Sequence, residues 1–260
     1  MGYYLNSDNV DFQKSLNSIF VDKSDAVRFF NTCINSNDQF ICVSRPRRFG
    51  KSMMTSLMNA YYSKGCDSKT LFDNLNIAKD PSYLEHLNKH HVIWIDIQEE
   101  IRLNNNNADT VLSFITEGVI KELEEEFQST FAQRNIPYAL RQLNLQQGLS
   151  FIIIIDEWDA VFRDCSHNKK LEKEYIEFLG GLFKGEKSQK KFISLAYITG
   201  ILPLNPVCSP RFRASASVLA QRIAFATGVL PNLYAFHRYT RNSILLSCTL
   251  DFQFEMQHPS

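Results

Sequence analysis

The chain has 260 residues, of which 44% are hydrophobic and 22% are charged, and its 28 basic side chains balance 28 acidic ones. This composition is typical of a soluble globular protein with room for one large domain or two small ones. The zero net charge excludes a global electrostatic attraction to nucleic acid or to an anionic membrane, so any such role must come from a local basic patch.

The sequence also predicts where in the cell the protein is located. The longest strongly apolar run, residues 149–155, is far shorter than the roughly 20 residues that a membrane-spanning helix needs. The first ten residues carry no basic stretch followed by an apolar one, so no targeting signal is visible. The six cysteines are scattered without a CxxC pair. We therefore expect a cytoplasmic protein with reduced cysteines and no membrane contact.

The first half of the chain alternates predicted helices with apolar strands. A helix is expected from Ser24, which would cap it, followed by a short strand over 39–44. A helix over 53–62 and a helical stretch opened by Pro81 come next, and 91–97 is again an apolar strand. The segment between the first strand and the second helix is thus a strand-to-helix turn.

The second half continues this alternation. Residues 104–107, all asparagine, predict a loop. From about 109 to 131, apolar residues recur every three or four positions, which predicts one long amphipathic helix with a solvated acidic face. A strand over 151–156, a helix over 171–183 and a strand over 192–198 follow. Apolar strands separated by helices are typical of a parallel sheet covered on both faces, so the expected fold class is α/β.

The composition changes near Pro203. Every lysine lies at or before Lys191, and after Pro203 only Asp251 and Glu255 oppose five arginines. Apart from a short helix predicted around 217–226, this segment shows no sustained pattern. Two interpretations stay open, a non-native or out-of-frame ending of a longer protein and an irregular but real subdomain.

The turn after the first strand carries phosphate-binding chemistry. Gly50-Lys51-Ser52 closes it as in a P-loop, where backbone N–H groups cradle phosphates, the lysine reaches the β and γ oxygens, and the hydroxyl binds Mg²⁺. The full pattern has glycine at the position of Arg45, and arginine tolerates a positive φ poorly. An ordinary capped helix start with a surface lysine is the alternative.

Two further signals lie at strand ends. Asp156 and Glu157 end the strand FIIII, where a Walker B pair would lie: the aspartate holds Mg²⁺ and the glutamate polarises the attacking water. Thr199 ends the strand FISLAYI, where many ATPases place a residue that senses the γ-phosphate. A helix-capping acid pair and a plain strand-end hydroxyl are the alternatives.

Taken together, these motifs resemble the AAA-ATPase-like family, which is common in gut bacteria and often carries a PD-(D/E)XK nuclease-like domain after the ATPase. The resemblance covers roughly residues 10–204 and rests on FVDKS at 20–24, SRPRRFGKS at 44–52, IDEWDA at 155–160 and AYITGILP at 196–203. It implies a P-loop NTPase-type parallel sheet flanked by helices over 1–204, followed by an atypical, irregular tail over 205–260.

Members of this family also lack the first glycine of the loop, so by resemblance Arg45 is not evidence against nucleotide binding. The implied cofactors are ATP and Mg²⁺, with Ser52 and Asp156 as metal ligands. Lys51, Glu157 and Thr199 would act in catalysis. The nucleotide would be bound by the loop residues Arg45, Pro46, Arg47, Arg48, Phe49, Gly50, Lys51 and Ser52.

In a sheet of this kind the strand over 192–198 lies between those over 39–44 and 151–156, and a fifth strand would cover the other edge of 39–44. Family members continue past the ILP segment into a helical lid, a pattern that this chain departs from. Acid-x-Lys, which a nuclease site of this type needs, occurs only at 67–69, so no nuclease activity is expected. This departure suggests that the C-terminal part is truncated.

The expected function is Mg-ATP binding with hydrolysis by water activated at the Asp156-Glu157 pair. The alternatives are a non-catalytic, nucleotide-dependent module that binds a protein or nucleic acid, and a small-molecule phosphotransferase. A homo-oligomer is compatible with the sequence, and the partner and the arginine finger stay unassigned. Phe49 and Trp158 are expected to pack in the core rather than to stack on a base. Arg47 and Arg48 could grip phosphate, reach a nucleic-acid backbone or pair with Asp159.

Overall fold

The computed structural model describes residues 2–104, 110–183 and 189–201. In these ranges the chain forms a sheet of four parallel strands in the order β1-β4-β3-β2. The strands are β1 (Phe40–Ser44), β2 (His91–Asp96), β3 (Phe151–Asp156) and β4 (Ile193–Gly200). The first helices are α1 (Val10–Leu16), α2 (Asp25–Cys33), α3 (Lys51–Tyr62), α4 (Lys69–Phe72), the 3-10 helix η1 (Asn76–Lys79) and α5 (Tyr83–His86). The others are α6 (Ile97–Leu103), α7 (Val111–Phe127), α8 (Ile136–Gln147), α9 (Ala160–Asp164), α10 (Lys169–Phe183) and α11 (Gln189–Phe192).

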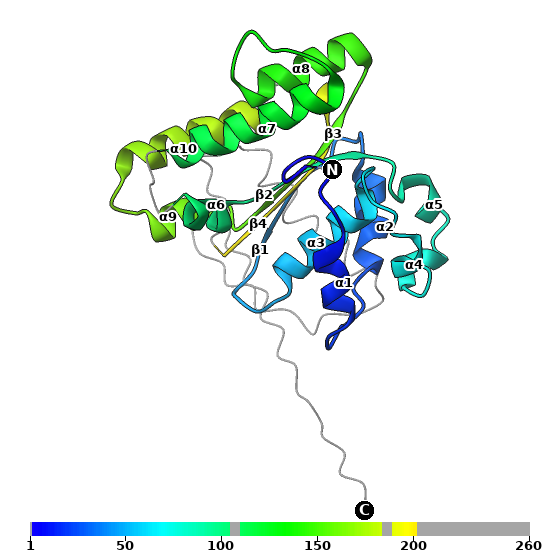
Figure 1. Cartoon of the computed structure of the whole chain (residues 1–260). Coiled ribbons are helices and arrows are strands. Elements are labelled where there is room, and N and C mark those ends of the chain that lie inside the picture. Colours follow the sequence, from blue (N-terminus) through cyan, green and yellow to red (C-terminus); the bar gives the residue numbers. More distant parts are fainter. Residues whose placement is uncertain (1, 105–109, 184–188, 202–260) are drawn as a thin grey trace, which may run out of the picture.

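Helices cover both faces of the sheet (Figure 1). The helices α1 to α5 lie on one side, and α7, α8 and α10 lie on the other. Successive side chains of a strand point to opposite faces, so Ile152 and Ile154 join the core under the first group, while Phe151, Ile153 and Ile155 join the core under the second. The two-sided burial of this apolar strand confirms the α/β class expected from the sequence.

The strand register brings the carboxyl ends of all four strands to one edge. Asp96 pairs with Asp156 across β2 and β3, and Ser44 pairs with Gly200 across β1 and β4. The strand β4, which ends near Thr199, therefore lies between β1 and β3, as predicted. The predicted fifth strand and the helix around 217–226 would lie outside the described residues.

The predicted strands agree with the structure to within two residues at each end, but one predicted helix is wrong. The helix expected to run to 131 ends at Phe127, because Gln128 adopts a left-handed conformation with φ of 50°. A separate helix, α8, begins after Asn135, whose side-chain oxygen accepts a hydrogen bond from the Tyr138 N–H at 3.0 Å. The predicted helix is therefore four residues too long at its end, and α8, which lies beyond that predicted end, was not predicted.

Three further details of the secondary structure differ from the predictions. Ser24 precedes α2 but makes no side-chain cap, because its hydroxyl accepts a hydrogen bond from the Ile77 N–H at 3.0 Å. The short helix α1 was not predicted, and Ile97, expected at the end of a strand, begins α6. Among the described residues, every helix is too short or too polar to cross a bilayer.

An N-terminal segment lies along the outer edge of β2. Leu5 forms an antiparallel bridge with Ile93, and the Trp94 N–H donates to the Tyr4 carbonyl at 2.9 Å. The Asn6 N–H donates to the Val92 carbonyl at 2.8 Å. Backbone groups at this sheet edge are therefore paired by residues that precede the sheet in the sequence.

Candidate functional site at the carboxyl edge of the sheet

The loop after β1 begins by extending the pairing with β4. The Arg45 N–H donates to the Gly200 carbonyl at 3.1 Å, and the Ser44 hydroxyl donates to the Ile201 carbonyl at 2.7 Å. The left-handed residues of the loop are Arg48, with φ of 69°, and Gly50, with φ of 76°. Arg45, the residue in the glycine position of the motif, is not among them, so its side chain costs no backbone strain there.

The central part of the loop is exposed to solvent. Pro46, Arg47, Arg48 and Phe49 are all exposed, and Phe49 keeps 42% of its surface accessible. The expectation that Phe49 packs in the core is therefore wrong. Trp158 is only 4% exposed and packs in the core as expected.

Lys51, the first residue of α3, is buried against the loop and faces the turn after β3. Its ammonium donates to the Pro46 carbonyl at 3.3 Å and lies 3.7 Å from Oε1 of Glu157. Only 7% of Lys51 is exposed. The structure thus brings together two predicted site residues that are more than a hundred positions apart in the sequence.

Asp156 is fully buried at the end of β3. Its Oδ1 accepts a hydrogen bond from the Glu157 N–H at 2.9 Å, and its Oδ2 accepts one from the Thr55 hydroxyl at 3.1 Å. Burial raises the pKa of this carboxyl group, and hydrogen bonds from Ser52, Glu157 and Thr55 oppose the shift. Ser52, which is exposed on the first turn of α3, therefore lies beside Asp156 as the metal hypothesis requires.

These groups fit the donor preference of Mg²⁺. A carboxylate and a hydroxyl supply the oxygen ligands that this ion favours, and Mg²⁺ usually keeps several waters and adds phosphate oxygens from its substrate. Within the described residues no three His, Cys, Asp or Glu side chains cluster as an all-protein metal cage would require. One carboxylate and one hydroxyl leave most positions around an octahedral ion to water or phosphate oxygens.

Glu157 lies at the sharp turn that follows β3. Its backbone adopts a left-handed conformation with φ of 47°, and its Oε2 accepts a hydrogen bond from the guanidinium of Arg163 at 2.8 Å. The next residue, Trp158, donates its backbone N–H to the Thr199 carbonyl at 3.0 Å. The turn is thus held against β4.

Thr199 is fully buried near the end of β4, in register with Val43 of the P-loop strand. Its hydroxyl has no hydrogen-bond partner in the part of the chain that the structure describes. A buried hydroxyl without a partner carries a desolvation cost of about 1–3 kcal/mol. Thr199 therefore lies beside the end of β1, from which the loop begins, and its hydroxyl is available for a further hydrogen bond.

Sequence reasoning missed two residues that join this group. Asp96 ends β2 and pairs in register with Asp156, and its Oδ1 accepts from the Glu99 N–H at 2.9 Å as the cap of α6. Burial, together with the nearby charges of Asp156 and Glu99, raises the pKa of Asp96 to about 6. The sequence did contain a signal for Asp96, because the apolar strand HVIWID ends in an acid just as FIIIID does. The other residue, Arg163, belongs to no motif.

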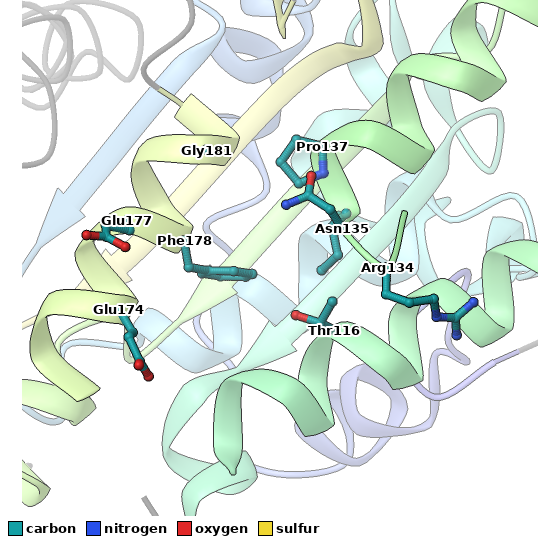
Figure 2. A pocket seen from close by; sticks show the side chains of 9 residues that line it. Thr116, Arg134, Asn135, Pro137, Glu174, Glu177, Phe178 and Gly181 are labelled. Carbon is teal, nitrogen blue, oxygen red and sulfur yellow. The ribbon is translucent and has the colours of Figure 1, made fainter. Parts of the chain in front are cut away.

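A cavity of about 260 Å³ lies elsewhere, between α7, α8 and α10 (Figure 2). The ring of Phe178 points into this space, whereas the guanidinium of Arg134 points away from Glu174 and Glu177. Arg134 is already paired, with Glu117 at 2.7 Å and with Glu124 at 2.8 Å. No residue of the loop or of the strand ends lines the cavity, so it is separate from the candidate site.

Comparison with known proteins agrees with this geometry. The model of one protein family, AAA-ATPase_like, described as a predicted AAA-ATPase, matches residues 10–207. This match includes the loop, both acidic strand ends and Thr199. A search among curated proteins found no match.

Proposed function

The chain belongs to the AAA-ATPase-like family, and on that premise we propose that it binds Mg-ATP at the loop between β1 and α3 and hydrolyses it. The observation that carries this proposal is the approach of the Lys51 ammonium to within 3.7 Å of the Glu157 carboxylate, beside the buried Asp156. A phosphate-binding cation, a metal-binding acid and a general base thus share one edge of the sheet.

In this proposal, binding uses the loop and the start of α3. The N-terminus of α3 carries the unpaired N–H groups and the partial positive charge that favour anions, and Lys51 adds a full charge. Ser52 and Asp156 would hold Mg²⁺, which neutralises charge on the β- and γ-phosphates. Arg47 and Arg48 are exposed on the same loop and would contact the polyphosphate from the solvent side.

Hydrolysis requires a base that accepts a proton from the attacking water. Glu157 can take this role, because its Oε1 faces Lys51 and therefore the region where the terminal phosphate would bind. Lys51 would exchange its long contact with Glu157 for the phosphate oxygens, which frees Oε1 for the water. The unpartnered hydroxyl of Thr199 would donate to the γ-phosphate or to that water.

The proposal is tested with a thermal melt of the wild type and of Lys51→Ala, each with and without Mg-ATP. At a hundredfold excess over the dissociation constant, ATP should stabilise the wild type by about 2.7 kcal/mol, which raises its Tm by a few degrees. Lys51→Ala should melt cooperatively but show a much smaller shift. A wild-type melt that ignores Mg-ATP would contradict nucleotide binding.

Turnover is tested separately with Glu157→Gln, which keeps the shape of the side chain but removes the base. We expect hydrolysis to fall by about 10²–10⁴-fold while the ATP-induced shift in Tm is retained. Phosphate release at the same rate in both proteins would contradict the role of Glu157. An unmeasurable wild-type rate with retained binding would favour the non-catalytic binding module.

A further inference from the structure

Arg163 is the closest cation to the proposed general base. It lies in α9, and its guanidinium NH1 donates to Oε2 of Glu157 at 2.8 Å, closer than the 3.7 Å contact of Lys51 with Oε1. The two side chains are only 16% and 13% exposed. Because little solvent screens this pair, its geometry matters more than that of an exposed ion pair.

The two cations hold the Glu157 carboxylate in one orientation. Arg163 occupies Oε2, and Oε1 is left to face Lys51 and the phosphate-binding loop. The left-handed backbone of Glu157, with φ of 47°, is strained for a residue other than glycine. Such a conformation persists where the surroundings fix it, and the Arg163 contact and the Glu157 N–H bond to Asp156 do so here.

Arg163 is itself anchored. Its NH1 lies 3.4 Å from Oδ1 of the fully buried Asp159, and Oδ2 of Asp159 accepts a hydrogen bond from the Ile201 N–H at 3.1 Å. The same NH1 nitrogen therefore contacts two carboxylates, and one of them, that of Asp159, is bound to the backbone just after β4. This support restricts where the Glu157 side chain can move.

We propose that Arg163 is a positioning residue for Glu157: it holds Oε2 so that Oε1 accepts the proton of the attacking water. This inference rests on the proposed ATPase function. Arg163 acts through Glu157 and does not contact the nucleotide in this arrangement. Since general-base catalysis depends on the placement of the accepting oxygen, loss of Arg163 lowers kcat and leaves ATP binding intact.

The experiment measures steady-state ATP hydrolysis by the full chain in wild type, Arg163→Ala and Arg163→Lys. We expect Arg163→Ala to lower kcat about 10- to 100-fold with a KM for ATP within twofold of the wild type. Arg163→Lys should restore most of the rate, because a single donor contacts Glu157 and an ammonium can supply it. Arg141→Ala, which removes an exposed arginine from α8, is the control and should leave both parameters unchanged.

A double-mutant comparison separates positioning from a general structural effect. If Arg163 acts through Glu157, adding Arg163→Ala to Glu157→Gln should cause no further loss of rate. The ATP-induced shift in Tm should be the same in Arg163→Ala and wild type. An additive loss, or a raised KM with an unchanged kcat, would overturn the inference and indicate a direct phosphate contact. A wild type without hydrolysis would overturn the ATPase proposal, and this inference with it.

Discussion

Gly50 combines a left-handed backbone with a place in the proposed phosphate-binding loop. Its φ of 76° lies in the left-handed region, and it immediately precedes α3 and Lys51. A methyl group added there would lie 3.6 Å from the Lys23 ammonium and 3.6 Å from the Met53 methyl, which are ordinary contacts. Substitution by alanine therefore tests the backbone requirement alone.

We predict that Gly50→Ala lowers the free energy of unfolding by about 1–2 kcal/mol and also weakens ATP binding, because the strained loop shifts its N–H groups. Urea denaturation and the ATP-induced shift in Tm measure the two effects. Gly148→Ala is a matched control: φ is 69° at the end of α8, and a methyl group there meets nothing within 4 Å. It should cost similar stability and leave ATP binding unchanged.

The residue scale also shows why the motifs predicted some members of the candidate site and missed others. Lys51, Asp156 and Glu157 could be predicted because each follows or ends an apolar strand, and parallel strands bring their carboxyl ends to one edge. Arg163 could not be predicted this way. Its contact with Glu157 depends on the left-handed turn at 157 and on the start of α9, neither of which has a sequence signature here.

At the scale of whole elements, the strands were predictable and one helix boundary was not. Strands buried on both faces read as continuous apolar runs, and β3 and β4 are buried along their whole length. The end of α7 has no such signal, because Gln128 rather than glycine takes the left-handed position. The start of α8 did carry a signal, in Asn135 followed by Pro137, but this helix lies beyond the predicted periodic stretch and was not predicted.

The cap of α8 provides a test at this scale. Asn135 is exposed and its side-chain oxygen accepts from the Tyr138 N–H at 3.0 Å, so Asn135→Ala leaves that donor without its intramolecular partner. We predict a loss of about 1 kcal/mol in the free energy of unfolding, measured by urea denaturation. Asn135→Asp keeps an acceptor and should stay within a few tenths of a kcal/mol of the wild type. Equal losses in both variants would contradict the capping role.

At the scale of the molecule, the sheet separates two apolar cores, and the candidate site lies at the carboxyl ends of the strands. Lys51 begins the helix that follows β1, and Asp156 ends β3, two strands away in the sheet, so their mutual position depends on strand pairing rather than on local sequence. The N-terminal segment contributes to that pairing at the outer edge of β2, through its bridge between Leu5 and Ile93.

One side chain holds this segment in place. The Glu122 carboxylate, on α7, accepts backbone hydrogen bonds from Tyr3 at 2.8 Å, Tyr4 at 2.9 Å and Leu5 at 2.7 Å. The Tyr4 ring packs over Gly118, where a methyl group would overlap it, and its hydroxyl donates to Glu100 at 2.8 Å. Three N–H donors thus converge on the two oxygens of one carboxylate. An amide of the same shape cannot accept all three hydrogen bonds, because only one of its two terminal atoms is an acceptor.

We therefore predict that Glu122→Gln releases the segment locally, because its amide N–H₂ would face backbone N–H groups and leave at least one of them unpaired, at a cost of about 1–3 kcal/mol. Hydrogen exchange measures this directly: the Trp94 amide, which donates to the Tyr4 carbonyl, should exchange faster in the variant, while the amides of β3 keep their protection. Glu125→Gln, one turn further along α7 and 67% exposed, is the control. Unchanged exchange at Trp94 would mean that strand pairing alone holds the segment, and that the contacts of Glu122 add nothing to it.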